Sequence, residues 1–359
     1  MKPIKIAMMS MTHGHTRKYY QTLKDNPKLD WVAVSTANDE VKKIFLDSVS
    51  GIPCYDSELE MLDAHPEIEA VVLASENSDH LRQVKLCAER GIHILSMKIP
   101  TFDMDEYEEM VKITKEAGIV FQIELELHYN PVVMRMKELV NTKKAGELLS
   151  FNATNITLSP VWAFPWQGMP ELSYGKRVPI KEGDPRFRGG ALCDHPHIFD
   201  MIREVTNSEF EMIFAQVAPN IRPDIEEEDM LSVIGKMKNG TIFSLDPSWS
   251  RMERRLKVPG PGWELYPKRM EVNITLNTDK GAVLTDCFGP NVYHNGTPDD
   301  NYVLQYTYFD EWIGLIDEFV DCIRNGKTPS INLARHKNTI KAMNAVYESI
   351  ATGKPVFFE

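Results

Sequence analysis

The sequence contains no apolar run approaching the ~18 residues that a membrane-spanning helix requires. Its start, MKPIKIAMM, is too short an apolar segment for a signal peptide and lacks a small-residue cleavage site. Positive charge is also scarce, with 40 lysines and arginines against 52 acidic residues and a formal net charge of −12. Nucleic acids and anionic membranes both require a basic surface. We therefore expect a cytoplasmic protein with a small-molecule ligand and with neither a nucleic acid nor a membrane as partner.

Cysteine is sparse as well. The five cysteines are scattered along the chain without any Cys-x-x-Cys pair, so neither a disulfide framework nor a zinc ribbon is indicated. Reduced, mostly structural thiols are the expected state, because free cysteine is among the most frequently buried residue types. Only Cys193 lies beside a candidate site.

The length of 359 residues exceeds the ~250–300 at which a single core stops growing, so two domains are expected. In the first third, short apolar runs such as KIAMMS, WVAVST and EAVVLAS alternate with amphipathic helical stretches. This alternation predicts an α/β domain with a doubly wound parallel sheet, which we place at residues 1–128. Such sheets bind ligands outside the carboxyl ends of their strands. The informative segments are therefore residues 10–15, 35–39, 75–80 and 97–100.

From residue 129 onward, strand-like runs joined by turn pairs such as Asn239-Gly240 predict an α+β domain with a large, mostly antiparallel open sheet. We assign residues 129–359 to ligand binding and oligomerisation, because one face of such a sheet stays free for a second copy of the chain. Residues 159–190 are rich in proline, glycine and aromatics and are expected to cover a cleft. The helix predicted at residues 336–352 is expected to pack back towards the first domain.

Several motifs together resemble one family. The turn ASENSDH keeps Asn77 and His80 of the family pattern, and MKIP keeps Lys98 of its Glu-Lys-Pro signature. The stretches GGALCDHPHIFDMIRE and AVYESIATGKPV also match. The chain in these respects resembles the Gfo/Idh/MocA family of NAD(P)-dependent oxidoreductases. This resemblance implies a Rossmann domain followed by a substrate-binding sheet domain, and hydride transfer between a nicotinamide cofactor and a hydroxyl carbon of a sugar or polyol. The combination of SMTHGH with MKIP resembles its glycoside 3-oxidase subgroup, which includes enzymes that oxidise C-glycosides.

Three residues are the catalytic candidates that the resemblance implies: Lys98 and the pair Asp194 and His197. Oxidation of a secondary alcohol needs a base near the hydroxyl, and the ordinary pKa of histidine, about 6.5, suits His197 to this role. Lys98 serves either as the base or as a donor that stabilises the alkoxide, and this choice stays open. Asp194 is one residue closer to the histidine than the family spacing Asp-x-x-x-His, and it could instead cap the helix that starts near Pro196.

Cofactor contacts are expected at the strand ends of the first domain. Aligned with the dinucleotide fingerprint G-x-G-x-x-G, the opening stretch reads Ser10-x-Thr12-x-x-His15, with every fingerprint glycine replaced. No arginine follows the second strand to bind a 2′-phosphate, which favours NAD over NADP, and a cofactor that stays bound and is re-oxidised in place is a further hypothesis. The expected cofactor-binding residues are Ser10, Thr12, His13, Gly14, His15, Thr36, Asn38, Ser75, Asn77, His80 and Lys98.

Sugar sites combine aromatic rings with polar side chains, and the second domain offers both. The expected substrate contacts are Asn155, Trp162, Trp166, Tyr174, Arg188, His195 and Trp249, with Phe164 and His128 as further candidates.

Three other functions compete with a dehydrogenase. His13-x-His15 and His195-x-His197 resemble metal-ligand pairs, as in metal-dependent barrel hydrolases, but the antiparallel second half argues against a barrel, and no metal is expected. An enzyme of the same fold could use NAD transiently to cleave a glycosidic bond. A non-catalytic family member is the third alternative, favoured by the altered glycine turn and opposed by the retention of Lys98 and His197.

Overall fold

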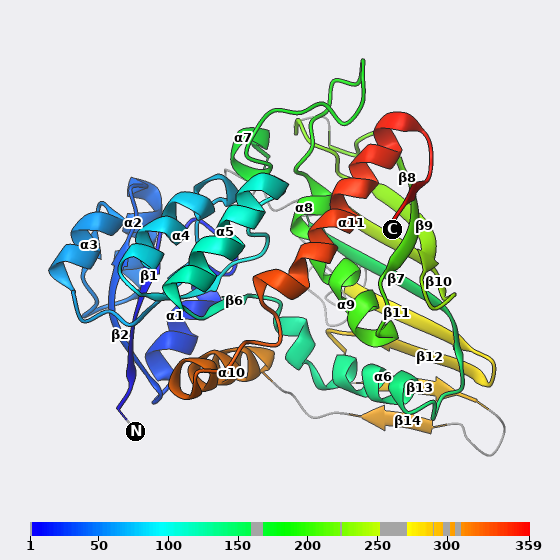
Figure 1. The fold of residues 1–359 in the computed structure, drawn as a ribbon, viewed down its shortest axis with the longest axis horizontal. Helices are drawn as coiled ribbons and strands as arrows, with labels where there is room; N and C mark the ends of the chain where they lie inside the picture. Colours follow the sequence, from blue (N-terminus) through cyan, green and yellow to red (C-terminus); the bar gives the residue numbers. More distant parts are fainter. Residues whose placement is uncertain are drawn as a thin grey trace, which may run out of the picture.

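A computed structural model describes residues 2–158, 168–222, 225–251, 271–289, 291–296, 302–305 and 310–359. It has two lobes, each built on one sheet (Figure 1). The first sheet has six strands in the order β3-β2-β1-β4-β5-β6, and every neighbouring pair in it is parallel. Its strands are β1 (Ile4–Met9), β2 (Leu29–Ser35), β3 (Cys54–Tyr55), β4 (Ala70–Leu73), β5 (His93–Ser96) and β6 (Phe121–Ile123).

Helices separate these strands in sequence and cover the sheet. They are α1 (Thr16–Asp25), α2 (Asp39–Ser48), α3 (Glu58–Ala64), α4 (His80–Glu89) and α5 (Met104–Ala117). The central strands read as continuous apolar runs because both faces are covered, and all four residues of β4 are buried. Local signals set the helix ends: Asp103 caps α5 by accepting from two backbone amides, and Gly118 ends it in the left-handed conformation. The predicted doubly wound parallel sheet is confirmed.

The second sheet has nine strands in the order β14-β13-β12-β11-β7-β10-β9-β8-β15. Only β7 and β10 pair in parallel, and the other neighbours are antiparallel, as predicted. In β9 buried and less buried side chains alternate, so one face packs inward and the other faces out. The strands are β7 (Leu148–Leu158), β8 (Phe210–Val217), β9 (Leu231–Met237), β10 (Ile242–Arg251), β11 (Glu271–Thr278), β12 (Gly281–Asp286), β13 (Asn291–Asn295), β14 (Tyr302–Gln305) and β15 (Val356–Phe357).

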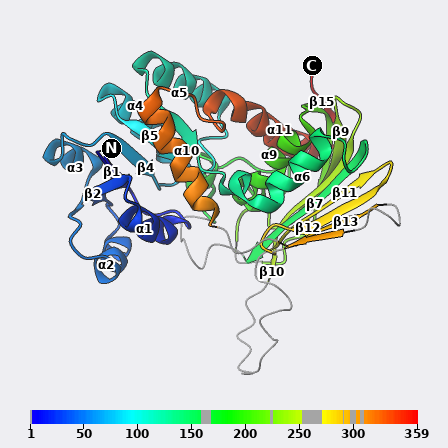
Figure 2. The same ribbon diagram turned by 90° about the horizontal axis from the view of Figure 1, so that it is seen from below.

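One face of the second sheet carries helices and the other is left bare by the described residues (Figure 2). The remaining helices are α6 (Pro131–Asn141), α7 (Pro170–Ser173), α8 (Ala191–Asp194), α9 (Pro196–Thr206), α10 (Glu311–Asn325) and α11 (Leu333–Thr352), together with the short 3₁₀ turns η1 (Asn77–Asp79) and η2 (Glu126–Tyr129). Helices α6, α9 and α11 lie between the second sheet and the first lobe (Figures 1 and 2). No helix in the described segments is long and apolar enough to cross a membrane.

Two helices of the C-terminal part contact the first lobe. Trp312 and Phe319 of α10 belong to the same apolar cluster as Ile6 of β1 and Tyr19 of α1. Helix α11 packs on β8 and α9 and also reaches α5 and β6, where the Tyr107 hydroxyl donates to the carbonyl of Leu333 at 2.8 Å. Because α10 completes the core of the first lobe, that lobe draws residues from both ends of the chain.

The loop expected at residues 159–190 is described from residue 168 onward, so Trp162, Phe164 and Trp166 lie outside the described residues. Its described part begins with α7, which lies against η1. There the side-chain amide of Asn77 donates to the carbonyl of Ser173 at 2.8 Å. Helix α7 therefore bridges the two lobes, as a cover over a cleft between them would.

Candidate active site

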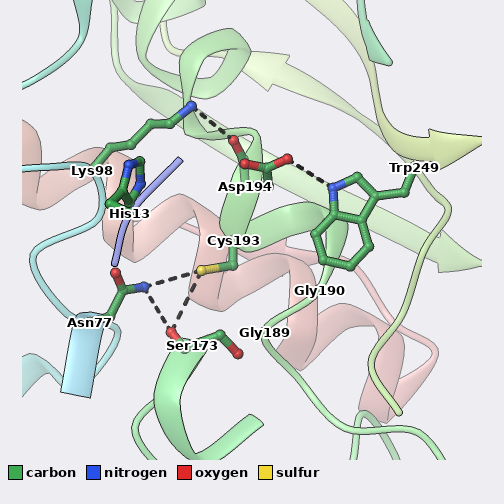
Figure 3. A pocket seen from close by; sticks show the side chains of 9 residues that line it. All are labelled: His13, Asn77, Lys98, Ser173, Gly189, Gly190, Cys193, Asp194 and Trp249. Carbon is green, nitrogen blue, oxygen red and sulfur yellow. Dashed lines mark hydrogen bonds between the residues drawn. The ribbon is translucent and has the colours of Figure 1, made fainter. Parts of the chain in front are cut away.

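A pocket lies where the carboxyl ends of the parallel strands meet α8 and the end of β10 (Figure 3). Four of the lining residues are sequence-predicted site residues of the first lobe or of the catalytic helix: His13, Asn77, Lys98 and Asp194. Trp249 of β10, a predicted substrate contact, lines the pocket with them. Sequence positions more than 200 residues apart thus converge here. The lining residues are His13, Asn77, Lys98, Ser173, Gly189, Gly190, Cys193, Asp194 and Trp249.

Lys98 follows β5 and points across the boundary between the lobes. Its Nζ lies 2.6 Å from Nε2 of His197 and donates to the backbone carbonyl of Asp194 at 3.2 Å. Both side chains are buried, with 7% of Lys98 and 5% of His197 exposed. When an ammonium is the donor, Nε2 of the imidazole must be the acceptor, and the ring proton then lies on Nδ1. The structure therefore joins two of the three predicted catalytic residues directly.

The environment keeps His197 neutral. Burial holds the pKa of His197 well below the ordinary 6.5, and the positive charge of Lys98 lowers it further. The Nδ1 atom of His197 is buried without a hydrogen-bond partner among the described residues. A neutral imidazole whose Nε2 faces an ammonium can accept a proton at that atom.

Asp194 ends α8 and is fixed by Trp249, whose indole nitrogen donates to Oδ2 of Asp194 at 2.9 Å (Figure 3). Burial alone would raise the pKa of this carboxyl, but His195, Lys98 and Trp249 together hold it below its ordinary value. The N-cap of α9 is His195, and its side chain makes no capping hydrogen bond. The alternative in which Asp194 caps the helix near Pro196 is therefore wrong, because this carboxylate is engaged by the indole instead.

Cys193 occupies the position that the family spacing Asp-x-x-x-His assigns to the aspartate, counted back from His197. Its Sγ accepts from the side-chain amide of Asn77 at 3.2 Å and lies 3.6 Å from the carbonyl of Ser173. Burial raises the pKa of this thiol, so it stays neutral. The pocket lining therefore contains the thiol of Cys193 at the family position of the aspartate and the carboxylate of Asp194 one residue later.

The altered turn after β1 fits a dinucleotide phosphate. Ser10 and Met11 have φ angles of 71° and 57°, the left-handed region that glycine usually provides. Helix α1 starts at Thr16, its N-cap His15 makes no side-chain capping bond, and its first turn has no acidic residue. The backbone N–H of His15 donates to Nδ1 of His13 and that of Thr16 to the carbonyl of His13, so this acid-free helix start attracts an anion through the helix dipole. The replaced glycines do not prevent the backbone from forming the turn.

The other expected cofactor residues of this edge form a hydrogen-bonded layer. Gln83, which the sequence reasoning missed, accepts from the Ser75 hydroxyl at 2.7 Å and donates to Oγ of Ser10 at 3.0 Å. The Thr12 hydroxyl donates to Glu76 at 2.7 Å. These contacts hold the turns after β1 and β4 together, while cofactor contact by these residues stays a prediction.

Three further residues have structural partners. Nδ1 of His80 donates to the carbonyls of Ile99 and Pro100 at 3.1 and 2.9 Å, which fixes the turn that carries Lys98. Asn38 caps α2 by accepting from a backbone amide, and Thr36 is buried at the end of β2. Asn38 is exposed and lies at the edge where an adenosine ribose is expected. That Asn38 binds the cofactor stays a prediction.

The predicted substrate residues do not gather at one place. Tyr174 and Arg188 contact each other, with Nη1 of Arg188 donating to the Tyr174 hydroxyl at 3.2 Å, and the guanidinium lies 5.2 Å from the ring centre of Tyr347 in α11. His195 is held by the Ser248 carbonyl at 3.2 Å. Asn155 of β7 is buried, and its Oδ1 has no partner among the described residues. Of the members of this set that the structure describes, Trp249 alone lines the pocket.

His128 lies outside that pocket lining too. Its Nε2 is 2.5 Å from Oδ2 of Asp200 in α9, and the Thr339 hydroxyl of α11 donates to the other oxygen of this carboxylate at 2.7 Å. Burial alone would raise the pKa of Asp200, but His128 holds it far below its ordinary value. This network ties η2, α9 and α11 together, and so fixes the helix that carries His197.

Two glutamates after β6 were not anticipated. Glu124 and Glu126 are buried beside the pocket, and Nδ1 of His15 lies 3.1 and 3.2 Å from the two oxygens of Glu124. Oε1 of Glu126 lies 3.9 Å from Nε2 of His197. Burial raises the pKa of Glu124 to about 7 and that of Glu126 to about 8. The available signal was the pattern Glu-x-Glu directly after a predicted parallel strand, at the edge where the other strand ends carry polar residues.

The two His-x-His pairs do not form one metal site. The rings of His13 and His15 lie 5.1 Å apart, edge to face, while His195 is bound by Ser248 on the other lobe. Within the described ranges, the one group of metal-ligand type whose donor atoms converge joins His15 to Glu124 and Glu126. A barrel hydrolase is not favoured, because the second half of the chain is a mostly antiparallel sheet.

Comparisons with known proteins agree with this architecture. The chain is 21% identical to D-xylose 1-dehydrogenase (NADP⁺) 2 of Haloferax volcanii, over 90% of this chain and 91% of the relative. It is 21% identical to myo-inositol 2-dehydrogenase of Thermotoga maritima, over 74% and 73% of the two chains. The crystal structure of aldose-aldose oxidoreductase from Caulobacter crescentus with glycerol superposes with a TM-score of 0.80, covering 99% of this chain and 100% of that one at 15% identity.

The family comparison covers most of both lobes. Residues 7–125 match the oxidoreductase family with an NAD-binding Rossmann fold, and residues 133–283 match the Gfo/Idh/MocA C-terminal domain. The matched ranges include Lys98, Asp194 and His197. The chain belongs to the Gfo/Idh/MocA family of oxidoreductases, with an NAD-binding Rossmann domain.

Proposed function

We propose that this protein oxidises a secondary hydroxyl of a sugar or glycoside, with NAD as the acceptor of the hydride. The observation that carries the proposal is the buried pair of Lys98 and His197, with 2.6 Å between Nζ and Nε2. An alcohol that loses hydride from carbon must also lose a proton from oxygen. A lysine in contact with a neutral histidine supplies both a donor to that oxygen and a destination for its proton.

Bound NAD supplies the acceptor for the hydride that leaves the carbinol carbon. The chain itself moves the proton. Lys98, an ammonium, gives one proton to Nε2 of His197 and takes the hydroxyl proton of the substrate in its place. The proton that the alcohol loses thus adds one positive charge, and this charge ends on the imidazole. Lys98 then remains an ammonium beside the new carbonyl oxygen. Asp194, held by Trp249, is oriented to bind a neighbouring hydroxyl.

The residues that would hold NAD are those of the turn after β1 and the N-terminus of α1, with Thr36 and Asn38 near the ribose. Their fit rests on the left-handed turn at Ser10 and Met11 and on the acid-free first turn of α1. The segment after β2, NDEVKK, starts with an amide and two acids, and these disfavour the 2′-phosphate of NADP. NAD is therefore the proposed cofactor.

The proposed position of oxidation is C3 of a glycoside. Its support is the combination of SMTHGH with MKIP, which resembles the glycoside 3-oxidase subgroup. The names of the relatives, which specify position 1 of xylose and position 2 of inositol, support a sugar or polyol substrate but not the C3 position. The test is to incubate the purified protein and NAD with free sugars, polyols, O-glycosides and C-glycosides. We expect a 3-oxo product from at least one glycoside. Activity confined to simple polyols would overturn the C3 assignment.

A homo-oligomer through the bare face of the second sheet is also proposed. On that face Leu284, Tyr293 and Val303 lie side by side on β12, β13 and β14, and 40%, 47% and 56% of these side chains are exposed. Ile234 and Ile242 add 51% and 59% exposed apolar side chains on β9 and β10. Water-exposed apolar groups spread over one sheet face are typical of an interface.

We expect the wild type to be oligomeric by light scattering after gel filtration, and the double variant Leu284→Glu/Tyr293→Glu to dissociate. The reason is that two buried, unpaired carboxylates at a closed interface carry a large desolvation cost. The control is Leu46→Glu on α2, which is 54% exposed and far from that face. A wild type that elutes as a monomer at micromolar concentration would contradict this interface.

A further inference from the structure

Three side chains next to the proposed catalytic pair transfer no proton in the mechanism above. They are His15, from the turn after β1, and Glu124 and Glu126, from the segment after β6. One donor atom of each lies within 4.8 Å of those of the other two. None of the surface of Glu124 and only 6% of that of Glu126 is exposed. Residues that follow β1 and β6, two strands separated by β4 and β5 in the sheet, thus converge in a buried position.

The carboxyls of Glu124 and Glu126 are buried side by side and hydrogen-bond to each other, and burial raises the pKa of both. Two adjacent carboxylates are expensive to bury unless a cation or donors compensate them. No lysine or arginine in the described parts of the chain forms an ion pair with either one, and Lys98 donates to His197 and to the carbonyl of Asp194. Oε2 of Glu126 is buried with no hydrogen-bond partner at all among these residues. This group therefore has an unused acceptor oxygen beside two carboxyls that a bound cation would hold in the ionised form.

We propose that His15, Glu124 and Glu126 bind a divalent metal ion, of the kind that accepts mixed nitrogen and oxygen ligands, such as Mn²⁺ or Zn²⁺. This departs from the sequence-based expectation of no metal, which considered only the His-x-His pairs. Three protein ligands leave coordination positions open for oxygen atoms of a small molecule. That such oxygens are the hydroxyls of a sugar rests on the proposed function, whereas the binding of the ion does not.

The test measures metal, separately from activity. Three proteins are compared: wild type, Glu126→Gln and His15→Gln. Each is purified without chelator, and its bound metal is measured by mass spectrometry. Each is then stripped of metal with chelator and titrated with Mn²⁺ and Zn²⁺ by calorimetry. We expect the wild type to retain metal and to bind at least one of the two ions, and both variants to lose at least about 10-fold in affinity. His15→Gln leaves both carboxylates in place, so it serves if Glu126→Gln fails to fold.

The matched control is Glu67→Gln, because Glu67 pairs with His65 at 3.3 Å on the surface and far from the pocket. It should bind metal like the wild type. A wild type without bound metal and without heat of binding for either ion would overturn the site, and so would equal affinity in wild type and Glu126→Gln. A protein that is metal-free yet oxidises sugars refutes the metal site alone, whereas one that binds metal but oxidises no sugar refutes the proposed function alone.

Discussion

Replacing Lys98 with methionine is expected to lower kcat/KM for the oxidised sugar by about 1,000-fold or more. Methionine keeps most of the length and the apolar contacts of the lysine stem, but it removes the donor to the substrate oxygen and the group that passes the proton to His197. Steady-state kinetics followed at the absorbance of reduced nicotinamide measure the effect. NAD binding, measured by calorimetry, separates the loss of catalysis from any loss of cofactor affinity.

The control for this variant is Lys85→Met, which removes a half-exposed lysine that pairs with Glu109 on the surface of α4. Its kinetics should match those of the wild type. If Lys98→Met retained more than about a tenth of wild-type kcat/KM while binding NAD normally, Lys98 would not be the group that contacts the reacting oxygen.

Replacing His197 with asparagine is expected to lower kcat by about 100-fold or more, because the proton from Lys98 loses its acceptor. The pH dependence gives a second signature. Burial and then Lys98 lower the pKa of His197 from 6.5, and oxidation requires the neutral ring. Wild-type activity should therefore fall only when the pH drops through that lowered pKa, and should be flat from pH 6.5 up to neutrality. In His197→Asn this acid limb should be absent.

His65→Asn is the matched control for this variant, since His65 is a partly exposed histidine outside the pocket. It should leave both kcat and the acid limb unchanged. An acid limb that persisted in His197→Asn with the same midpoint would mean that another group accepts the proton, and the Lys98 to His197 route would be wrong.

The parallel sheet was predictable because its physics is local. Strands covered on both faces read as apolar runs such as AVVL, and helix boundaries carry caps such as Asp103 that the sequence displays. Lys98 and His197 were found through motifs at fixed spacings. That they touch each other depends on how the two lobes pack, which no local pattern specifies.

The rest of the site depended on three-dimensional context. Glu124 and Glu126 look like solvated charges in sequence, and only the closure of the second lobe and α10 over the sheet edge buries them. Tyr174 and Arg188 read as sugar contacts, but in the structure they contact each other and α11. In sequence, Asp194 is a site candidate with a helix cap as the alternative, and the deciding contact comes from Trp249, 55 residues away.

The direct measurement of hydride transfer uses a sugar deuterated at its carbinol carbons, chosen from the substrates found in the glycoside and polyol panel. The protein is mixed with this sugar and NAD, and the reduced cofactor is isolated and analysed by mass spectrometry. We expect deuterium in the reduced nicotinamide with the wild type, and a strongly diminished yield of reduced cofactor with Lys98→Met. A ketone that forms while the cofactor gains neither absorbance nor deuterium would contradict an NAD-dependent oxidation at this site.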